Sequence, residues 1–330
     1  MEVRVMRGVR FEEFGGPEVL QLVELPLPEP GPGQVAIDVE YVGVNFADLQ
    51  ARTIGYRVPG LPFVPGLELS GHVRSLGEGV RGLAVGQPVA AITDGGAYAE
   101  VAVVDAATTF PVPEEIDLRT AATLPTVLPT AFALIHTIGK VQPGETVLVQ
   151  GAAGGVGTVA GQIAKLAGAR AVYGVVSGSA KADYAREVGY DDAFLTETFD
   201  ADVQRVTAGR GVDVVLDSVG GKTLSRGLSS LARFGRLISY GNAGGEPGWQ
   251  VGQPELYPKG ISVSGFSILG LSSDAPEVLR DIATRAFELV TGGDVSLPIT
   301  AEFPLAGATD AHRLMESRSS TGKLILAVAG

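Results

Sequence analysis

Alternating hydrophobic and polar positions predict a β-rich first part of the chain. Val35, Ile37 and Val39 alternate with small or charged neighbours, which is the pattern of a strand with one buried face. A second short apolar run covers 101–104. Stretches rich in proline and glycine, such as 28–33, mark turns between these runs. We therefore expect mainly β-sheet before about residue 120.

From about residue 122 the pattern changes to apolar runs that alternate with helical segments. This alternation is typical of a doubly wound parallel sheet. A further helix near 276–291 and two short strands near 299–303 and 323–328 are expected to close the chain. The predicted strands of the middle part are 146–150, 171–176, 212–217, 236–240 and 261–267, and its predicted helices are 157–167, 179–188 and 222–232.

The most informative stretch joins the strand expected at 146–150 to the helix that follows it. Glycines cluster there, at Gly151, Gly154, Gly155 and Gly157. Strand, glycine turn and helix are the context that a dinucleotide-binding turn requires, because glycines let the backbone approach a pyrophosphate. The helix N-terminus then offers unpaired N–H groups and a partial positive charge. The alternative is a tight turn without a ligand.

The residues after the second strand of this sheet bear on the choice of cofactor. An acidic residue there selects NAD, whereas a basic residue without an acid accommodates the 2′-phosphate of NADP. Here the segment 177–181 reads Ser-Gly-Ser-Ala-Lys and holds no Asp or Glu. Ser177 and Lys181 can bind a phosphate dianion, which favours NADPH. The alternative is that Lys181 is a solvated lysine in the first turn of a helix.

Length and composition narrow the classes of function. The 330 residues suggest two domains of ordinary size. The net charge of −12, without a block of Lys or Arg, argues against a nucleic-acid partner or an anionic membrane. Pro125 and Pro129 interrupt the apolar stretch 121–139, so no membrane span is expected. The N-terminus lacks the apolar core of a signal peptide, and we expect a cytoplasmic protein.

Metal chemistry is not expected. The chain has no cysteine, which excludes thiolate ligands and disulfides. Its three histidines, His72, His136 and His312, lie far apart in the sequence. We interpret them as surface histidines or as satisfied core histidines.

The chain resembles the zinc-independent quinone oxidoreductases of the medium-chain dehydrogenase/reductase superfamily, the group that includes ζ-crystallin. The 144–165 segment is similar to their signature along its full length. Further similarities follow in the family's order over nearly the whole chain. They are Val42-Gly-Val-Asn45-Phe-Ala-Asp48, Pro65-Gly-Leu-Glu68-Leu-Ser-Gly71, Leu124-Pro125 with Thr130-Ala131, Gly211-Val-Asp213-Val-Val-Leu-Asp217, Gly241-Asn242, Glu316-Ser-Arg318 and Gly322-Lys323.

The resemblance implies an α/β architecture of two domains. A GroES-like β-barrel catalytic domain would comprise 1–122 and 269–330, and a Rossmann domain that binds NADPH would comprise 123–268. Zinc-dependent relatives carry a cysteine where this chain has Asn45, and Gly-His-Glu where it has Gly66-Leu67-Glu68. The resemblance therefore implies no metal, and alcohol oxidation is disfavoured without a Lewis acid. Glu68 is expected to remain as a structural carboxylate.

The resemblance also implies the cofactor and acceptor contacts. Asn45 would face the nicotinamide and the substrate, and Tyr56 would orient the acceptor or deliver a proton, unless it only packs at the pocket rim. Asp48 is expected to cap or brace its loop. The groups that donate hydrogen bonds to the acceptor, on Asn45 and Tyr56, would be neutral at pH 7. A pocket of this kind suits an uncharged acceptor better than a carboxylate. The cofactor-binding residues implied are Asn45, Thr130, Gly154, Gly155, Val156, Gly157, Ser177, Lys181, Asn242, Phe266, Ile268 and Arg318.

Three functions stay open at this point. The first is an NADPH-dependent quinone reductase that transfers hydride to a conjugated carbonyl acceptor. The second is an enoyl reductase of a biosynthetic pathway, which shares the fold and the cofactor. The third is an NADPH-binding structural protein with little turnover. The family's habit of joining Rossmann sheets through edge strands implies a homodimer or a dimer of dimers, with 261–267 as the joining strand.

Overall fold

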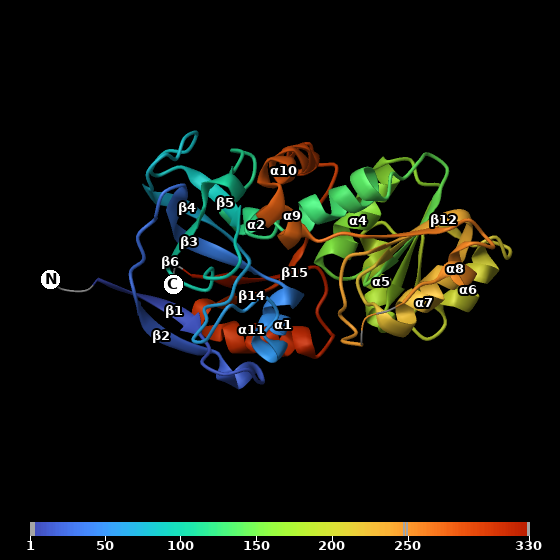
Figure 1. Cartoon of the computed structure of the whole chain (residues 1–330), viewed down its shortest axis with the longest axis horizontal. Helices are drawn as coiled ribbons and strands as arrows, with labels where there is room; N and C mark the ends of the chain where they lie inside the picture. Colours follow the sequence, from blue (N-terminus) through green and yellow to red (C-terminus); the bar gives the residue numbers. More distant parts are fainter. Residues whose placement is uncertain (1–3, 247, 249, 329–330) are drawn as a thin grey trace. The chain divides into compact units, whose positions relative to one another are not determined.

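The computed structural model describes residues 4–246, 248 and 250–328. The chain divides into two compact units, which are described separately below. Unit 1 comprises 1–129, 269–293 and 297–330, and unit 2 comprises 130–268 and 294–296. The first and last parts of the chain therefore share one unit (Figure 1). The assignment of a catalytic role to one unit and a cofactor-binding role to the other stays a prediction.

In the described part of the chain, unit 1 is built on a seven-stranded sheet of the order β14-β15-β3-β4-β5-β7, in which β6 also pairs with β3. The C-terminal strand β15 pairs with the long N-terminal strand β3, and β14 pairs with the other side of β15 (Figure 1). A separate antiparallel pair is formed by β1 (Val5–Arg10) and β2 (Gln21–Pro26). The strands of the large sheet are β3 (Gln34–Val44), β4 (Glu68–Leu76), β5 (Pro88–Ile92), β6 (Val101–Asp105), β7 (Thr109–Pro111), β14 (Ile299–Pro304) and β15 (Lys323–Ala327).

The alternation at 35–39 forms part of β3, where Val35, Ile37 and Val39 are buried as expected. The helix that matters most for the site is α1 (Phe46–Ile54), which starts directly after β3. Gly55 ends it in the left-handed conformation, with φ of 72°. The other helices of this unit are η1 (Pro17–Val19), η2 (Ala106–Thr108), α2 (Leu118–Ala121), α10 (Pro276–Thr291), η4 (Leu305–Gly307) and α11 (Ala308–Glu316).

Two helices contain positions at which the chain passes from one unit to the other. They are α3 (Val127–Phe132) and α9 (Ile268–Asp274).

Among the described residues, unit 2 contains a six-stranded parallel sheet of the order β10-β9-β8-β11-β12-β13. Its strands are β8 (Thr146–Gln150), β9 (Ala171–Val176), β10 (Asp192–Leu195), β11 (Val212–Asp217), β12 (Leu231–Ser239) and β13 (Ser262–Gly265). Its helices are α4 (Gly155–Leu166), α5 (Ser179–Glu187), α6 (Phe199–Val206), α7 (Gly221–Ser229) and α8 (Gln253–Leu256), with the π-helical turn η3 (Ala133–Ile138) before the first strand. The expected α/β fold, with a GroES-like part and a doubly wound parallel sheet, is confirmed.

Two details of unit 2 differ from the sequence prediction. The helix expected at 222–232 ends at Ser229, because Leu231 already pairs with Val212 of β11. The strand β10 and the helix α6 were not predicted. In α6, Phe199 and Val203 are buried four positions apart, so a short helical pattern was present between charged residues.

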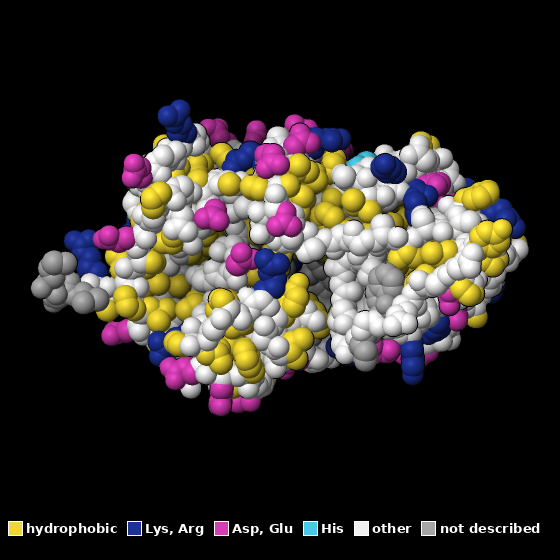
Figure 2. All heavy atoms as spheres, viewed as in Figure 1, with side chains coloured by type: hydrophobic (Ala, Val, Ile, Leu, Met, Phe, Trp, Pro, Cys, Tyr) yellow, Lys and Arg dark blue, Asp and Glu magenta, His cyan; other side chains and the backbone are white. Residues whose placement is uncertain are grey.

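The surface carries mixed charges. On the face shown in Figure 2, acidic and basic side chains are scattered among neutral ones, and the described residues there form no large basic area. Among the described residues, none of the helices has the length and apolar character needed to cross a membrane.

Candidate functional site

The glycine turn of unit 2 leads directly from β8 into α4. Gly154 precedes the helix with extended backbone, and no side chain caps the first turn. A Cβ on Gly157 would lie 2.3 Å from the carbonyl oxygen of Gly151, so only glycine fits there. The N–H groups at the start of this twelve-residue helix are therefore presented to an anion.

The loops around this turn meet at one edge of the sheet. In a parallel sheet the carboxyl ends of all strands lie on the same side, and β8 and β11 are the neighbours at which the strand order reverses. The backbone N–H of Ala152 donates to Val175 of β9 (3.1 Å), and that of Ala243 donates to Ser218 after β11 (3.0 Å). This edge is where a doubly wound fold binds a nucleotide.

Ser177 and Lys181 lie at the same edge, after β9. Ser177 is exposed and directly follows the strand, and Lys181 is half-buried in the first turn of α5. A lysine in that turn is not favoured by the helix dipole, which attracts negative charge at an N-terminus. The contact of Lys181 with a 2′-phosphate stays a prediction.

The other expected cofactor residues of unit 2 follow neighbouring strands. Asn242 comes after β12, is exposed, and donates from Nδ2 to the carbonyl oxygen of Glu246 (2.9 Å). Phe266 follows β13 and donates its N–H to Ser239 (2.9 Å). Ile268 begins α9, and Thr130 is buried in α3. The sheet thus brings Gly154, Gly155, Val156, Gly157, Ser177, Asn242 and Phe266 to one edge.

In unit 1, the fully buried Glu68 is the centre of a polar network. Its Oε2 accepts from the backbone N–H (2.9 Å) and the hydroxyl (2.6 Å) of Thr126. Its Oε1 accepts from Asn45 Nδ2 (2.9 Å) and from Lys323 Nζ (2.5 Å). Glu68 is thus the structural carboxylate that the sequence suggests.

Lys323 supplies the positive charge of this network, and sequence reasoning missed it. Its side chain is 3% exposed, and its ammonium also donates to the Val44 carbonyl oxygen (3.1 Å) and to Asn45 Oδ1 (2.9 Å). A charged residue in the apolar strand β15 was the available signal, since lysine is almost never fully buried unless it is paired.

The network determines how Asn45 is oriented. Its Oδ1 accepts from Lys323 and lies 3.3 Å from the Thr126 hydroxyl, whose one hydrogen is closer to Glu68, and its Nδ2 donates to Glu68 and to the Gly43 carbonyl oxygen (3.3 Å). The oxygen and the nitrogen of the amide thus both have partners within unit 1. The role of Asn45 toward nicotinamide or acceptor stays a prediction, and the contacts described here are internal to unit 1.

Asp48 braces the start of α1, as expected. Its carboxylate accepts from the backbone N–H groups of Asn45 (2.8 Å) and Gly66 (3.1 Å). Burial raises the pKa of Asp48 to about 7 from an ordinary 3.8. The folded chain therefore holds the Asp48 proton more tightly than the unfolded chain does. The resulting contribution to the free energy of unfolding is complete below pH 3.8 and is lost as the pH rises through about 7.

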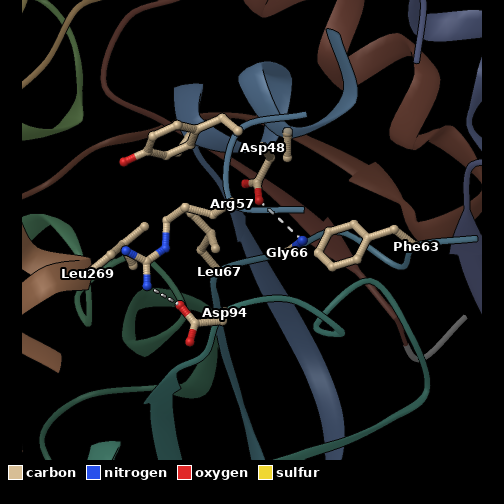
Figure 3. A pocket seen from close by; sticks show the side chains of 10 residues that line it. Asp48, Arg57, Phe63, Gly66, Leu67, Asp94 and Leu269 are labelled. Atoms are coloured by element: carbon tan, nitrogen blue, oxygen red, sulfur yellow. Dashed lines mark hydrogen bonds and ion pairs between the residues drawn. The ribbon is translucent and has the colours of Figure 1, made fainter. Parts of the chain in front are cut away.

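Tyr56 lies beyond the other end of α1 and lines a small pocket of unit 1. The pocket has a volume of about 10 Å³, enough for roughly one water molecule. Figure 3 shows Asp48 bonded to Gly66 and Arg57 reaching Asp94, with Leu67 between them and Leu269 on the outer side of Arg57. The other lining residues are Ala47, Ala51, Tyr56 and Phe63.

The acceptor pocket expected from the resemblance stays a prediction, and two features of this small pocket bear on it. Asn45 is not among its lining residues, although Ala47 and Asp48 from the same end of α1 are. Two charged residues, Arg57 and Asp94, do line it, so its polar groups are not all neutral. Sequence reasoning missed both, although Arg57 directly follows Tyr56.

Arg318 lies in unit 1, just after α11. It is exposed and has a left-handed backbone, with φ of 56°, and its N–H donates to the Met315 carbonyl oxygen (3.1 Å). Glu316, two residues earlier, is paired with the fully buried Arg52. The contact of Arg318 with a 2′-phosphate stays a prediction.

The histidines have local partners. His312 is fully buried between Arg52, whose Nε donates to its Nδ1 (3.3 Å), and the hydroxyl of Tyr98 (3.0 Å from Nε2). Burial lowers the pKa of His312 to about 3, so its ring is neutral at pH 7. His72 lies 2.9 Å from Glu40. His136 packs against Phe132, with ring centroids 4.5 Å apart.

The donor set around Glu68 does not fit a zinc ion. Leu67 has no ligating atom, Asn45 stands where a thiolate would be needed, and the ammonium of Lys323 is bonded to the carboxylate. Among the residues that the structure describes, no three His, Cys, Asp or Glu side chains are grouped to hold a metal.

Two known protein families match two separate segments of the chain. Residues 31–114 match the alcohol dehydrogenase GroES-like domain, and residues 155–284 match the family described as zinc-binding dehydrogenase. The name of the second family refers to zinc, but this chain has Asn45 and Leu67 where zinc-dependent relatives carry a cysteine and a histidine.

Proteins similar to the chain over nearly its full length include a quinone oxidoreductase of Pseudomonas aeruginosa. It is 36% identical, over 97% of this chain and 99% of that protein. The human synaptic vesicle membrane protein VAT-1 homolog is 32% identical, over 98% of this chain and 86% of its own length. Among solved structures, Escherichia coli quinone oxidoreductase complexed with NADPH has a TM-score of 0.91 at 30% identity and covers 98% of this chain and 100% of that one.

Proposed function

The chain belongs to the quinone oxidoreductase family of the medium-chain dehydrogenase/reductase superfamily, and from this premise we propose that it is an NADPH-dependent reductase of quinones. The observation that carries the proposal is the uncapped glycine turn at α4, with Lys181 and no acidic residue in the segment 177–181 after β9. The similar Escherichia coli enzyme, solved with NADPH, supports it.

The cofactor residues fit NADPH in unit 2. The N–H groups at the start of α4 would hold the pyrophosphate, and Ser177 and Lys181 would hold the 2′-phosphate. NADPH supplies the hydride, and a quinone that accepts it also needs one proton to become the hydroquinone. Negative charge develops on the acceptor oxygen, and we propose the Tyr56 hydroxyl as its hydrogen-bond donor.

The proposed function is tested by NADPH oxidation with a panel of quinones and enones. A quinone reductase oxidises NADPH with quinones faster than with enones, whereas an enoyl reductase shows the reverse order. Tight NADPH binding without oxidation of NADPH by quinones or enones would contradict both reductase functions. It would support an NADPH-binding structural protein. Each rate is compared with the same mixture without protein, because quinones react slowly with NADPH on their own.

Replacement of Lys181 by alanine is expected to weaken NADPH and to leave NADH almost unchanged. A charge-assisted hydrogen bond to phosphate contributes about 1.5–3 kcal/mol, so the NADPH dissociation constant should rise roughly ten- to hundredfold. NADH lacks the 2′-phosphate and does not make this contact. The measurement is the dissociation constant of each cofactor by fluorescence titration.

The matched control for this variant is Lys165→Ala. Lys165 lies near the C-terminal end of α4 and forms a surface ion pair with Asp191. Its loss removes the same charge away from the nucleotide edge and should change neither dissociation constant. If Lys181→Ala weakened both cofactors equally, Lys181 would not be the 2′-phosphate contact.

We also propose that the protein is a cytoplasmic homodimer or dimer of dimers. Within the described residues, β13 lies at the edge of the parallel sheet, with one paired neighbour, β12. An open edge strand favours pairing with a second copy across a two-fold axis. Light scattering at micromolar concentration is expected to give at least twice the mass of one chain, and a monomer would contradict the proposal.

A further inference from the structure

We propose that Arg57 selects acceptors that carry an anionic group beside the conjugated carbonyl, by binding that group at the pocket of unit 1. This inference rests on the proposed function and concerns which acceptors the same site takes. Arg57 lines the pocket together with Tyr56, the residue proposed to contact the acceptor oxygen. A group that binds Arg57 therefore lies close to Tyr56.

The backbone of Arg57 is the first observation. Its φ is 56°, in the left-handed region that glycine or asparagine adopts at lower cost. The preceding turn fixes this conformation, because the N–H of Val58 donates to Gly55 (3.1 Å). This turn fixes where the Arg57 side chain leaves the backbone, next to Tyr56 at the pocket.

The ion pair of Arg57 is the second observation. One guanidinium nitrogen lies 2.9 Å from Asp94 Oδ1, and the two side chains are 34% and 67% exposed. Exposed pairs of this kind contribute little, so an anionic ligand can replace Asp94 at small cost. Within the described part of the chain, this is the one hydrogen bond of the guanidinium, which has five N–H donors.

The surroundings make the guanidinium an effective anion receptor. Leu67 and Leu269 line the pocket near the Arg57 side chain, and an apolar wall strengthens a charge-assisted hydrogen bond. The second carboxyl of the pocket, Asp48, accepts hydrogen bonds from the N–H groups of Asn45 and Gly66, and Figure 3 draws the bond to Gly66. Asp94 is the carboxylate that an anion on Arg57 would replace.

The pocket volume limits what can enter. About 10 Å³ accommodates an oxygen atom or a water molecule and excludes an aromatic ring. We therefore place the ring of the acceptor outside the pocket, with an oxygen of its sulfonate or carboxylate group on Arg57. Recognition of this kind requires no change in the fold of unit 1.

The experiment compares naphthoquinone with naphthoquinone sulfonate, which differ by one anionic group. Binding is measured by calorimetry on the full-length protein with NADP⁺, so that no turnover occurs. Because the chain has no cysteine, addition of the quinone to a thiol does not disturb the titration. The variants are Arg57→Gln, Asp94→Asn and, as a matched surface arginine of unit 1, Arg81→Gln.

Arg57→Gln is expected to weaken the sulfonate roughly ten- to hundredfold and the neutral quinone less than about twofold. Asp94→Asn is expected to strengthen the sulfonate, and Arg81→Gln to change neither ligand. Equal binding of the sulfonate by wild type and Arg57→Gln, equal weakening of both ligands, or no binding of the sulfonate by wild type would each overturn the proposal. Failure of the proposed function is seen separately, as absence of NADPH oxidation by the wild type.

Discussion

Replacement of Lys323 by methionine is expected to destabilise the protein by about 3–5 kcal/mol. The ammonium is 3% exposed and neutralises Glu68, which is fully buried. Methionine keeps much of the volume and removes the charge, so the carboxylate is left uncompensated. Two further acceptors, Val44 and Asn45, lose their donor as well. The free energy of unfolding in urea, measured on the full-length protein, checks the value.

Two further variants separate charge from packing. Lys165→Met removes a lysine from a surface ion pair with Asp191 and should change the free energy of unfolding by less than about 0.5 kcal/mol. The double variant Lys323→Met with Glu68→Gln restores neutrality and should recover part of the loss. If Lys323→Met were as stable as Lys165→Met, the network around Glu68 would not hold unit 1 together.

The regular elements could be predicted where the local pattern and the tertiary contacts agree. The strands at 146–150, 171–176 and 212–217 match β8, β9 and β11, because each is a buried apolar run bounded by turn residues. The helix expected to reach residue 232 ends earlier, since pairing of Leu231 with Val212 replaces the last helical turn. Non-local pairing of this kind leaves no signal in a short window of sequence.

The candidate site was predictable in unit 2 and only partly so in unit 1. The glycine turn is a contiguous motif whose flanking strand and helix can be recognised together. The network in unit 1 joins Glu68 to Lys323, which are 255 residues apart in the chain, and no spacing rule connects them. The charged pair of the pocket, Arg57 and Asp94, comes from two loops whose proximity depends on the folded sheet.

Tyr56→Phe tests the chemistry of the proposed site most directly. The variant keeps the aromatic ring and removes only the hydroxyl. If that hydroxyl donates to the acceptor oxygen as negative charge develops, its loss should lower kcat on the order of ten- to a thousandfold, as removal of one oxyanion donor does. The dissociation constant of NADPH should stay nearly unchanged, because Tyr56 is not among the expected cofactor-binding residues.

The measurement is kcat for Tyr56→Phe on one quinone and one enone, with Tyr257→Phe as the matched control. Tyr257 is 79% exposed and lies in unit 2, outside the pocket, so its hydroxyl should be dispensable. A loss on both acceptors assigns the donor role to Tyr56. A loss on the enone alone would indicate that the quinone is reduced one electron at a time, since no proton donor is then needed in the slow step. Wild-type rates on both acceptors would remove Tyr56 from the mechanism and leave it as a residue that packs at the rim of the pocket.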